Sequence, residues 1–220
     1  MCDTKEINDK NNKKKNGVMP FFYWGDLVWL KYLIENQDII KFSLLQTYRK
    51  QRNFNRTYLL GGNGIVVLTI PVSYEGMFPK ISEIKICYKE NWQKNHLKKI
   101  YYAYKNSAYF EYYWNSIEEI YKQQPEFLWE FNYLVIHWLK KHFQIQKVEC
   151  TNEWLPLANF SYRLEETPDI AFPQYYQLFS QQFISNLSSL DLLMNLGVES
   201  EQYLKNISLN YNDIKIFRKK

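Results

Sequence analysis

Few features of this sequence point to a disulfide-stabilised, exported or membrane-spanning protein. Its three cysteines, Cys2, Cys87 and Cys150, lack the spacing of a metal or redox motif, and an odd, scattered set is typical of a reducing compartment. No apolar run is long enough to span a bilayer, and the first 17 residues lack the apolar core of a signal peptide. We therefore expect a cytoplasmic protein without membrane insertion.

Common catalytic and cofactor motifs are also absent from the sequence. There is no Walker loop, no GxGxxG segment after a strand and no GxSxG nucleophile elbow. His137 and His142 are five residues apart, so they cannot form the i, i+4 pair of a zinc-binding helix. We expect neither a metal nor a cofactor.

The sequence does contain ample material for a hydrophobic core. Of its 220 residues 46% are hydrophobic and 18% aromatic, which predicts a single globular domain. The formal net charge is +5, but six cations lie in Lys13–Lys15 and Arg218–Lys220, so the body is near neutral and we expect no nucleic-acid partner. We predict a disordered polar tail at 1–17, one domain at 18–199 and a basic C-terminal extension at 200–220.

Apolar periodicity predicts an α/β fold, in which a small mixed sheet with a hairpin packs against a block of three central helices and a C-terminal helix. The predicted helices are an opening helix within 21–36 with Asp26 as its cap, then 91–105, 108–122 and 126–143, and a short helix from Asn186 or Ser188 to Gly197. The predicted strands are 38–45, 57–60, 65–72, 81–88 and 147–151. Gly61–Gly64 should supply the positive φ of the hairpin turn, and 152–185 should be irregular.

A polar, cationic cluster stands directly before the predicted hairpin. It contains Arg49, Lys50, Gln51, Arg52, Asn53, Asn55 and Arg56. Arginine offers a planar fork and lysine a point charge, so the cluster suits a phosphate or a carboxylate. A solvated basic turn is the alternative.

His96 shares one face of a predicted helix with Trp92, Ile100 and Tyr104. A histidine on such a face is either a hydrogen-bonded core residue or, if it reaches a cleft, a proton-transfer group. In the segment KKIYYAYK, aromatic residues alternate with lysines as in nucleic-acid stacking surfaces, but helix packing explains the same spacing and we favour it. Asn132 is an amide within an apolar helix, and a buried amide must orient either a backbone loop or a ligand.

Taken together, these segments resemble the WbqC-like protein family, in its Bacteroidetes-type subgroup, over about Gly17–Glu199. The most specific pieces are the Asn55–Arg56 pair, Trp92 and His96 ahead of Tyr104, the helix of Asn132, and the stretch Phe183–Asn195. Many members carry His-Gln-Pro after the first strand, whereas this chain has Val18-Met19-Pro20, and the glycine-rich segment that often precedes the C-terminal part is missing. The sequence therefore departs from the family pattern at this histidine and in the missing glycine-rich segment.

The family is named after a protein from O-antigen gene clusters. The resemblance implies an enzyme of O-antigen or other surface-polysaccharide biosynthesis, a transferase that acts on a phosphorylated or nucleotide-linked sugar. It implies that His96 is the catalytic acid or base and that a polar set binds the substrate: Lys50, Gln51, Asn55, Arg56, Trp92, Tyr104, Asn132, Gln177, Asn186, Asp191 and Asn195.

The missing histidine favours a different class of function, a non-catalytic accessory or scaffold protein of a polysaccharide assembly complex. The enzyme hypothesis predicts that His96 and the cluster around Asn55 and Arg56 share one pocket.

Overall fold

The computed structural model describes residues 17–38, 40–50, 53–153, 171–179 and 182–208. The predicted N-terminal tail, Gln51 and Arg52 of the polar cluster, and the middle of the predicted irregular segment lie outside these ranges. Within them, no helix combines the length and the apolar character needed to cross a membrane.

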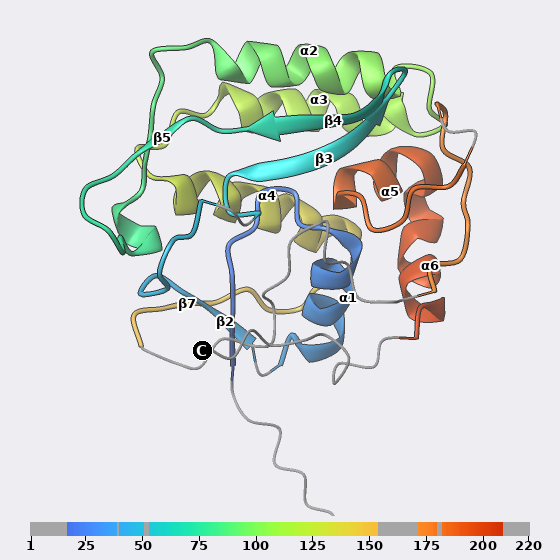
Figure 1. The fold of residues 1–220 in the computed structure, drawn as a ribbon. Helices are drawn as coiled ribbons and strands as arrows, with labels where there is room; N and C mark the ends of the chain where they lie inside the picture. The colour runs from blue at the N-terminus through green and yellow to red at the C-terminus, as the bar shows by residue number, and fades with distance from the viewer. Residues whose placement is uncertain (1–16, 39, 51–52, 154–170, 180–181, 209–220) are drawn as a thin grey trace, which may run out of the picture.

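A small parallel sheet combines two strands from the start of the chain, on either side of the opening helix, with a third strand that follows the central helices (Figure 1). The sheet has the order β1-β2-β7, with β1 at Gly17–Met19, β2 at Ile40–Ser43 and β7 at Cys150–Thr151. Helix α1 spans Leu27–Asn36, and the Asp26 carboxylate accepts a hydrogen bond from the Trp29 backbone N–H at 2.9 Å. The predicted cap is therefore confirmed, because this carboxylate satisfies one of the free N–H groups of the first turn.

The hairpin is formed by β3 at Arg56–Gly61 and β4 at Gly64–Thr69, with Arg56 paired to Thr69. Only Gly64 of the four turn residues has a positive φ, at +101°, so the turn needs glycine's freedom at one position and not along the whole segment. The strand predicted at 65–72 is divided, because β4 ends at Thr69 and a separate β5 covers Val72–Ser73.

The predicted strand at 81–88 is wrong over its first half. Ile81–Glu83 form the 3₁₀ turn η1, and only Lys85–Ile86 form a strand, β6, which pairs with β5. Ile81 and Ile84 are both buried, and a spacing of three suits a 3₁₀ turn better than a strand. The Ile81 N–H donates to the Gln46 carbonyl at 2.7 Å, so a long-range contact fixes the turn.

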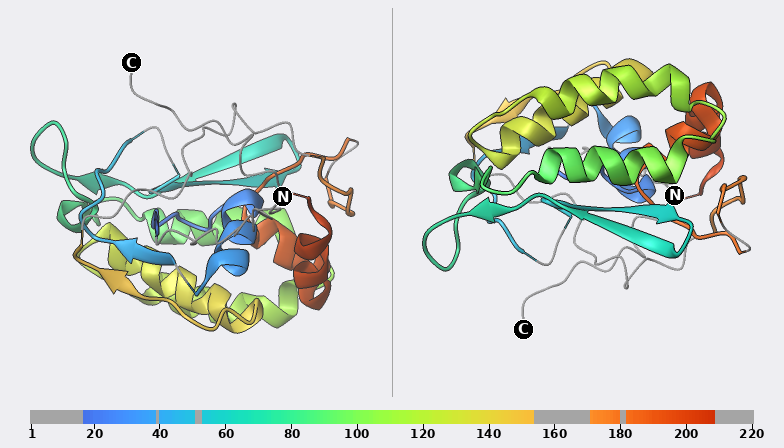
Figure 2. Two further views of the ribbon diagram at one scale, coloured as in Figure 1. Left: turned by 90° about the horizontal axis from the view of Figure 1, so that it is seen from below. Right: turned by 90° about the horizontal axis from the view of Figure 1, so that it is seen from above.

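The three predicted central helices are confirmed as α2 at Trp92–Tyr104, α3 at Phe110–Lys122 and α4 at Leu128–His142. The hairpin packs on one side of α2, while α3 and α4 form the layer on its other side (Figure 2). The α/β class is thus confirmed, although the strands divide into three small sheets, one parallel and two antiparallel, among the described residues.

The C-terminal helix is α5 at Ser189–Leu196, capped by the Ser188 hydroxyl. It is followed by η3 at Gly197–Glu199 and by α6 at Ser200–Asn206, a helix that was not predicted. Tyr203, Leu204 and Ile207 are buried, so residues placed in the C-terminal extension contribute to the core.

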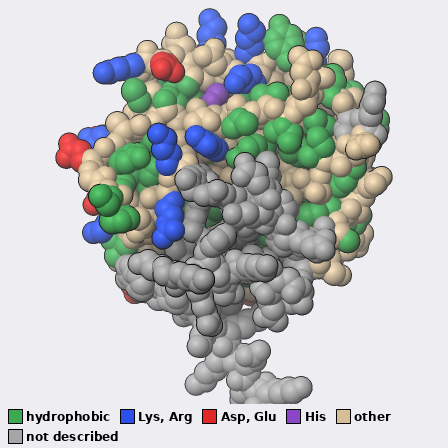
Figure 3. Space-filling view, viewed as in Figure 1, with side chains coloured by type: hydrophobic (Ala, Val, Ile, Leu, Met, Phe, Trp, Pro, Cys, Tyr) green, Lys and Arg blue, Asp and Glu red, His purple; other side chains and the backbone are tan. Residues whose placement is uncertain are grey.

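The surface has a mixed character, with hydrophobic side chains and Lys or Arg side chains interspersed on the face in Figure 3. The core is strongly aromatic, and Tyr23, Trp24 and Trp29 are fully buried. The most exposed large apolar side chains include Met77, Phe78 and Val198.

Candidate functional site

The predicted site residues belong to several structural environments. Lys50 is exposed on a loop, Arg56 is half-buried at the start of β3, and Gln51 lies outside the described residues. Most of the others are buried: Asn55, Trp92, His96, Tyr104, Asn132, Gln177, Asn186 and Asp191. All of these except Trp92 take part in one of three sets of internal hydrogen bonds.

The first network is a chain of aromatic side chains that ends at His96, which is only 4% exposed. The Tyr23 hydroxyl bonds His96 Nδ1 at 2.9 Å and also contacts the Tyr121 hydroxyl, to which Trp24 Nε1 donates at 3.1 Å. The ring of His96 further bonds the backbone of Thr69. Because a backbone carbonyl can only accept, the ring nitrogen that faces Thr69 carries the proton and Nδ1 accepts from Tyr23. A neutral imidazole is therefore compatible with both contacts of the ring, to Tyr23 and to Thr69.

Burial lowers the pKa of His96 from its ordinary 6.5 to about 4, and nearby Lys99 acts in the same direction. The hydrogen bond to Thr69 opposes this shift but is the smaller effect. Thr69 pairs with Arg56 in the hairpin, so His96 lies close to the predicted cluster in space. The contact is made through the backbone of β4, and the ring is enclosed by Tyr23 and Trp92.

The second network surrounds the buried carboxylate of Asp191 in the first turn of α5. It accepts hydrogen bonds from the Tyr104 hydroxyl at 2.8 Å, the Tyr175 hydroxyl at 2.6 Å and Gln177 Nε2 at 3.3 Å. Desolvation raises the pKa of Asp191 even though these three donors act in the opposite direction. Asn195 belongs to the same helix and donates to the Asp191 carbonyl. The network joins α2 and the segment around Tyr175 to α5.

The third group consists of asparagines that bind backbone groups. Asn132 Nδ2 donates to the carbonyls of Phe21 and Phe54, both at 2.7 Å. Asn55 Nδ2 donates to the Ile70 carbonyl at 2.8 Å, and Asn186 Oδ1 accepts from the Val28 N–H at 3.1 Å. These amides hold loops and the start of α1 in place.

Several of the predicted residues nevertheless keep a buried polar atom that has no hydrogen-bond partner among the described residues. These atoms are Asn55 Oδ1, Arg56 Nε, Trp92 Nε1, Asn132 Oδ1 and Asn186 Nδ2. Native proteins leave few such atoms, so these residues have more hydrogen-bonding capacity than their internal bonds use.

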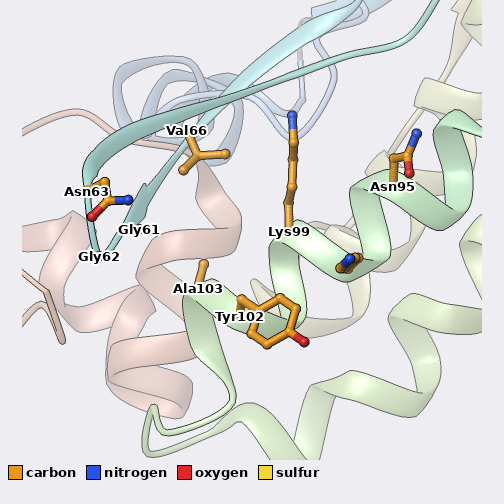
Figure 4. Close-up of a pocket in the computed structure, with 9 residues that line it drawn as sticks. Gly61, Gly62, Asn63, Val66, Asn95, Lys99, Tyr102 and Ala103 are labelled. Carbon is orange, nitrogen blue, oxygen red and sulfur yellow. The ribbon is translucent and has the colours of Figure 1, made fainter.

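An open groove of about 480 Å³ lies between the tip of the hairpin and the outer face of α2 (Figure 4). It is lined by Gly61, Gly62, Asn63 and Val66 from the hairpin and by Asn95, Lys98, Lys99, Tyr102 and Ala103 from α2. Lys99 extends from α2 toward the hairpin, where its ammonium group lies 3.4 Å from the Val67 carbonyl. None of these nine lining residues is acidic, so the groove suits an anionic ligand.

None of the predicted site residues that the structure describes lines this groove. Its lysines and Tyr102 belong to KKIYYAYK, the segment in which the sequence showed an alternation of cations and aromatics. The proximity of the hairpin turn to this segment had no local signal, because it depends on how β3 packs on α2. Among the described residues no group of three or more His, Cys, Asp or Glu side chains could hold a metal ion.

Comparison with known proteins identifies a family but no individual relative. No curated protein matches the chain, and no solved structure matches it. The family model of the WbqC-like protein family matches residues 29–159, which is more than half of the chain. The match includes Asn55, Arg56, His96 and Asn132 and ends before Gln177. The chain therefore belongs to the WbqC-like protein family.

Proposed function

We propose that this protein takes part in O-antigen or other surface-polysaccharide biosynthesis as a non-catalytic accessory protein, and that it binds a phosphorylated or nucleotide-linked sugar in the groove between the hairpin and α2. The observation that carries the proposal is the groove itself, which has two lysines and no acidic side chain among its nine described lining residues. The biosynthetic setting comes from the origin of the family's name.

The lining of the groove fits the parts of such a ligand. Lys98 and Lys99 can neutralise phosphate oxygens as point charges. Asn63 and Asn95 each offer an amide donor and acceptor, which suits sugar hydroxyls. Tyr102 is 56% exposed, and although its ring contacts Lys105 and Tyr101, its exposed part can meet a sugar or a nucleobase.

The accessory role follows from the state of His96. Group transfer with His96 as general acid or base would require its ring to reach a substrate and to titrate near neutral pH. The ring is buried, its Nδ1 is hydrogen-bonded to the Tyr23 hydroxyl, and its pKa of about 4 keeps it neutral at physiological pH. These properties suit a core histidine better than a proton-transfer group.

A ligand panel tests the proposal. The melting temperature would be measured with UDP-, GDP- and CDP-sugars and with simple sugar phosphates, since a ligand at 100 times its Kd adds about 2.7 kcal/mol of stability. We expect stabilisation by at least one of them, and its loss in the variant K98Q/K99Q. Lys94 is exposed on the same helix and does not line the groove, so K94Q is the matched control.

Two results would contradict the proposal. If none of these compounds raises the melting temperature, the ligand class is wrong. If a ligand is turned over and H96Q abolishes turnover but not the stabilisation, the protein is an enzyme and the accessory role fails.

A further inference from the structure

The loop between β5 and η1 carries two adjacent, highly exposed apolar side chains. Met77 is 84% and Phe78 is 76% exposed, and Gly76 turns the chain just before them with a φ of +77°. Figure 2 shows this loop projecting from the edge of the molecule. Single exposed apolar residues are ordinary, but two large ones at the tip of a projecting loop indicate a surface that meets an apolar phase.

The base of the loop is held firmly against the body of the protein. The Tyr48 N–H donates to the Pro79 carbonyl at 2.8 Å, and Thr47 forms a β-bridge with Lys80. The rings of Tyr48 and Tyr74 lie 5.4 Å apart. The tip is therefore presented on a fixed support, directly beside the segment that begins the basic cluster.

Three cationic residues adjoin this support in the sequence. Arg49, Lys50 and Lys80 are exposed, and none of the three forms an ion pair within the described part of the chain. Of the neighbouring acids, Glu75 lies beside the tip and Glu83 accepts a hydrogen bond from the Lys80 N–H. In Figure 3, hydrophobic side chains and Lys or Arg side chains adjoin one another on the left side of the molecule.

We propose that this loop docks the protein on an anionic lipid surface. Met77 and Phe78 enter the boundary between headgroups and acyl chains, and Arg49, Lys50 and Lys80 contact the negatively charged headgroups. Apolar side chains beside unpaired cations match the two layers of such an interface. The expectation of no membrane insertion rested on the lack of a spanning run, and a loop tip requires no such run.

Co-sedimentation with vesicles tests this docking. The full chain would be mixed with vesicles of phosphatidylcholine alone and of phosphatidylcholine with phosphatidylglycerol. We expect binding only to the anionic vesicles, weakening as the salt concentration rises. The variant M77S/F78S should bind at least about tenfold more weakly, since burial of either side chain contributes about that factor. Each of R49Q, K50Q and K80Q should weaken binding about fivefold.

Matched controls distinguish docking through the loop from non-specific binding to the vesicles. Val198 is 79% exposed elsewhere on the surface, and Lys141 is exposed on α4, so V198S and K141Q should bind like the parent. All substituted side chains are exposed, and unchanged melting temperatures would show that the variants are folded. Absence of binding to anionic vesicles at low salt, or full binding by M77S/F78S, would overturn the proposal.

Discussion

At the scale of single residues, buried polar side chains in this protein act mainly on its own backbone and on one another. His96 accepts from Tyr23 and donates to Thr69, and Asn132 holds two carbonyls of distant loops. Such groups are costly to bury unless every donor finds an acceptor. Their contribution to stability can therefore be measured without a ligand.

The pKa of His96 predicts a dependence of stability on pH. The unfolded chain has the ordinary pKa of 6.5 and the folded protein about 4, so between these values the unfolded state binds more protons. The contribution of His96 to the free energy of unfolding has its full value above pH 6.5. It falls by about 3 kcal/mol as the pH drops toward 4. Denaturant titrations from pH 8 to pH 4 measure the loss.

Burial also lowers the pKa values of His137 and His142, so both add to the same trend. H96Q should remove the largest part of the slope, whereas H137Q should leave most of it. Equal slopes in H96Q and the parent would show that His96 is not held neutral.

The two bonds of Asn132 predict a loss of stability on substitution. N132L keeps a similar volume but removes both donors, which leaves the carbonyls of Phe21 and Phe54 buried without a partner. We expect the free energy of unfolding to fall by about 2–4 kcal/mol. N95A, at an exposed site, should change it by less than about 0.5 kcal/mol. A small effect of N132L would mean that water reaches these carbonyls.

At the scale of elements, helix ends and turns depend on glycines in two different ways. Gly197 ends α5 with a φ of +53°, and a Cβ there would lie 2.3 Å from the ring of Tyr109. Gly64 in the hairpin turn has a φ of +101°, but a Cβ there would meet nothing within 4 Å. One glycine is needed for its backbone and for space, the other for its backbone alone.

These geometries predict the order of two substitutions. G64A should cost about 1–3 kcal/mol from backbone strain. G197A should cost a further 1–3 kcal/mol, roughly, because the ring of Tyr109 must move. Urea unfolding of both variants tests this order. An equal loss of unfolding free energy in the two variants would show that the Tyr109 ring can move at little energetic cost.

At the scale of the whole molecule, Asp191 connects parts of the chain that are far apart in sequence. Its carboxylate accepts hydrogen bonds from Tyr104 of α2 and from Tyr175 and Gln177 of the segment before α5. In D191A the hydroxyls of Tyr104 and Tyr175 would lose this acceptor, whereas Gln177 Nε2 would keep its bond to the Ile184 carbonyl at 2.9 Å. Asp191 therefore helps to attach α5 and the segment before it to α2.

We expect D191A to lower the free energy of unfolding by roughly 3 kcal/mol or more, because two buried tyrosine hydroxyls lose their acceptor. Y104F removes one of the three bonds and should cost less. E111A, an exposed acid on α3, is the control and should be nearly neutral. Thermal and denaturant unfolding would measure all three, and a cost for D191A no larger than that for Y104F would contradict the network.

Much of the secondary structure could be predicted because its signals are local. The Asp26 and Ser188 caps, the glycines of the hairpin and Gly197, and the periodicity of the central helices act within one turn or one strand pair. The strand at 81–88 was mispredicted because Ile81 is held by Gln46. Helix α6 was missed although Glu201 and Lys205 have the i, i+4 spacing of a helical ion pair.

The sequence by itself determined the α/β class, the order of the main helices and the membership in the WbqC-like family, since periodicity, capping and motif spacing are properties of the chain. Only the tertiary structure decided what the polar residues do. Packing buries His96, Asp191 and Asn132 and gives each of them internal hydrogen-bond partners, places Lys98 and Lys99 beside the hairpin, and leaves Phe78 exposed. Burial and hydrogen-bond partners depend on contacts between distant segments, so no local pattern could assign these roles.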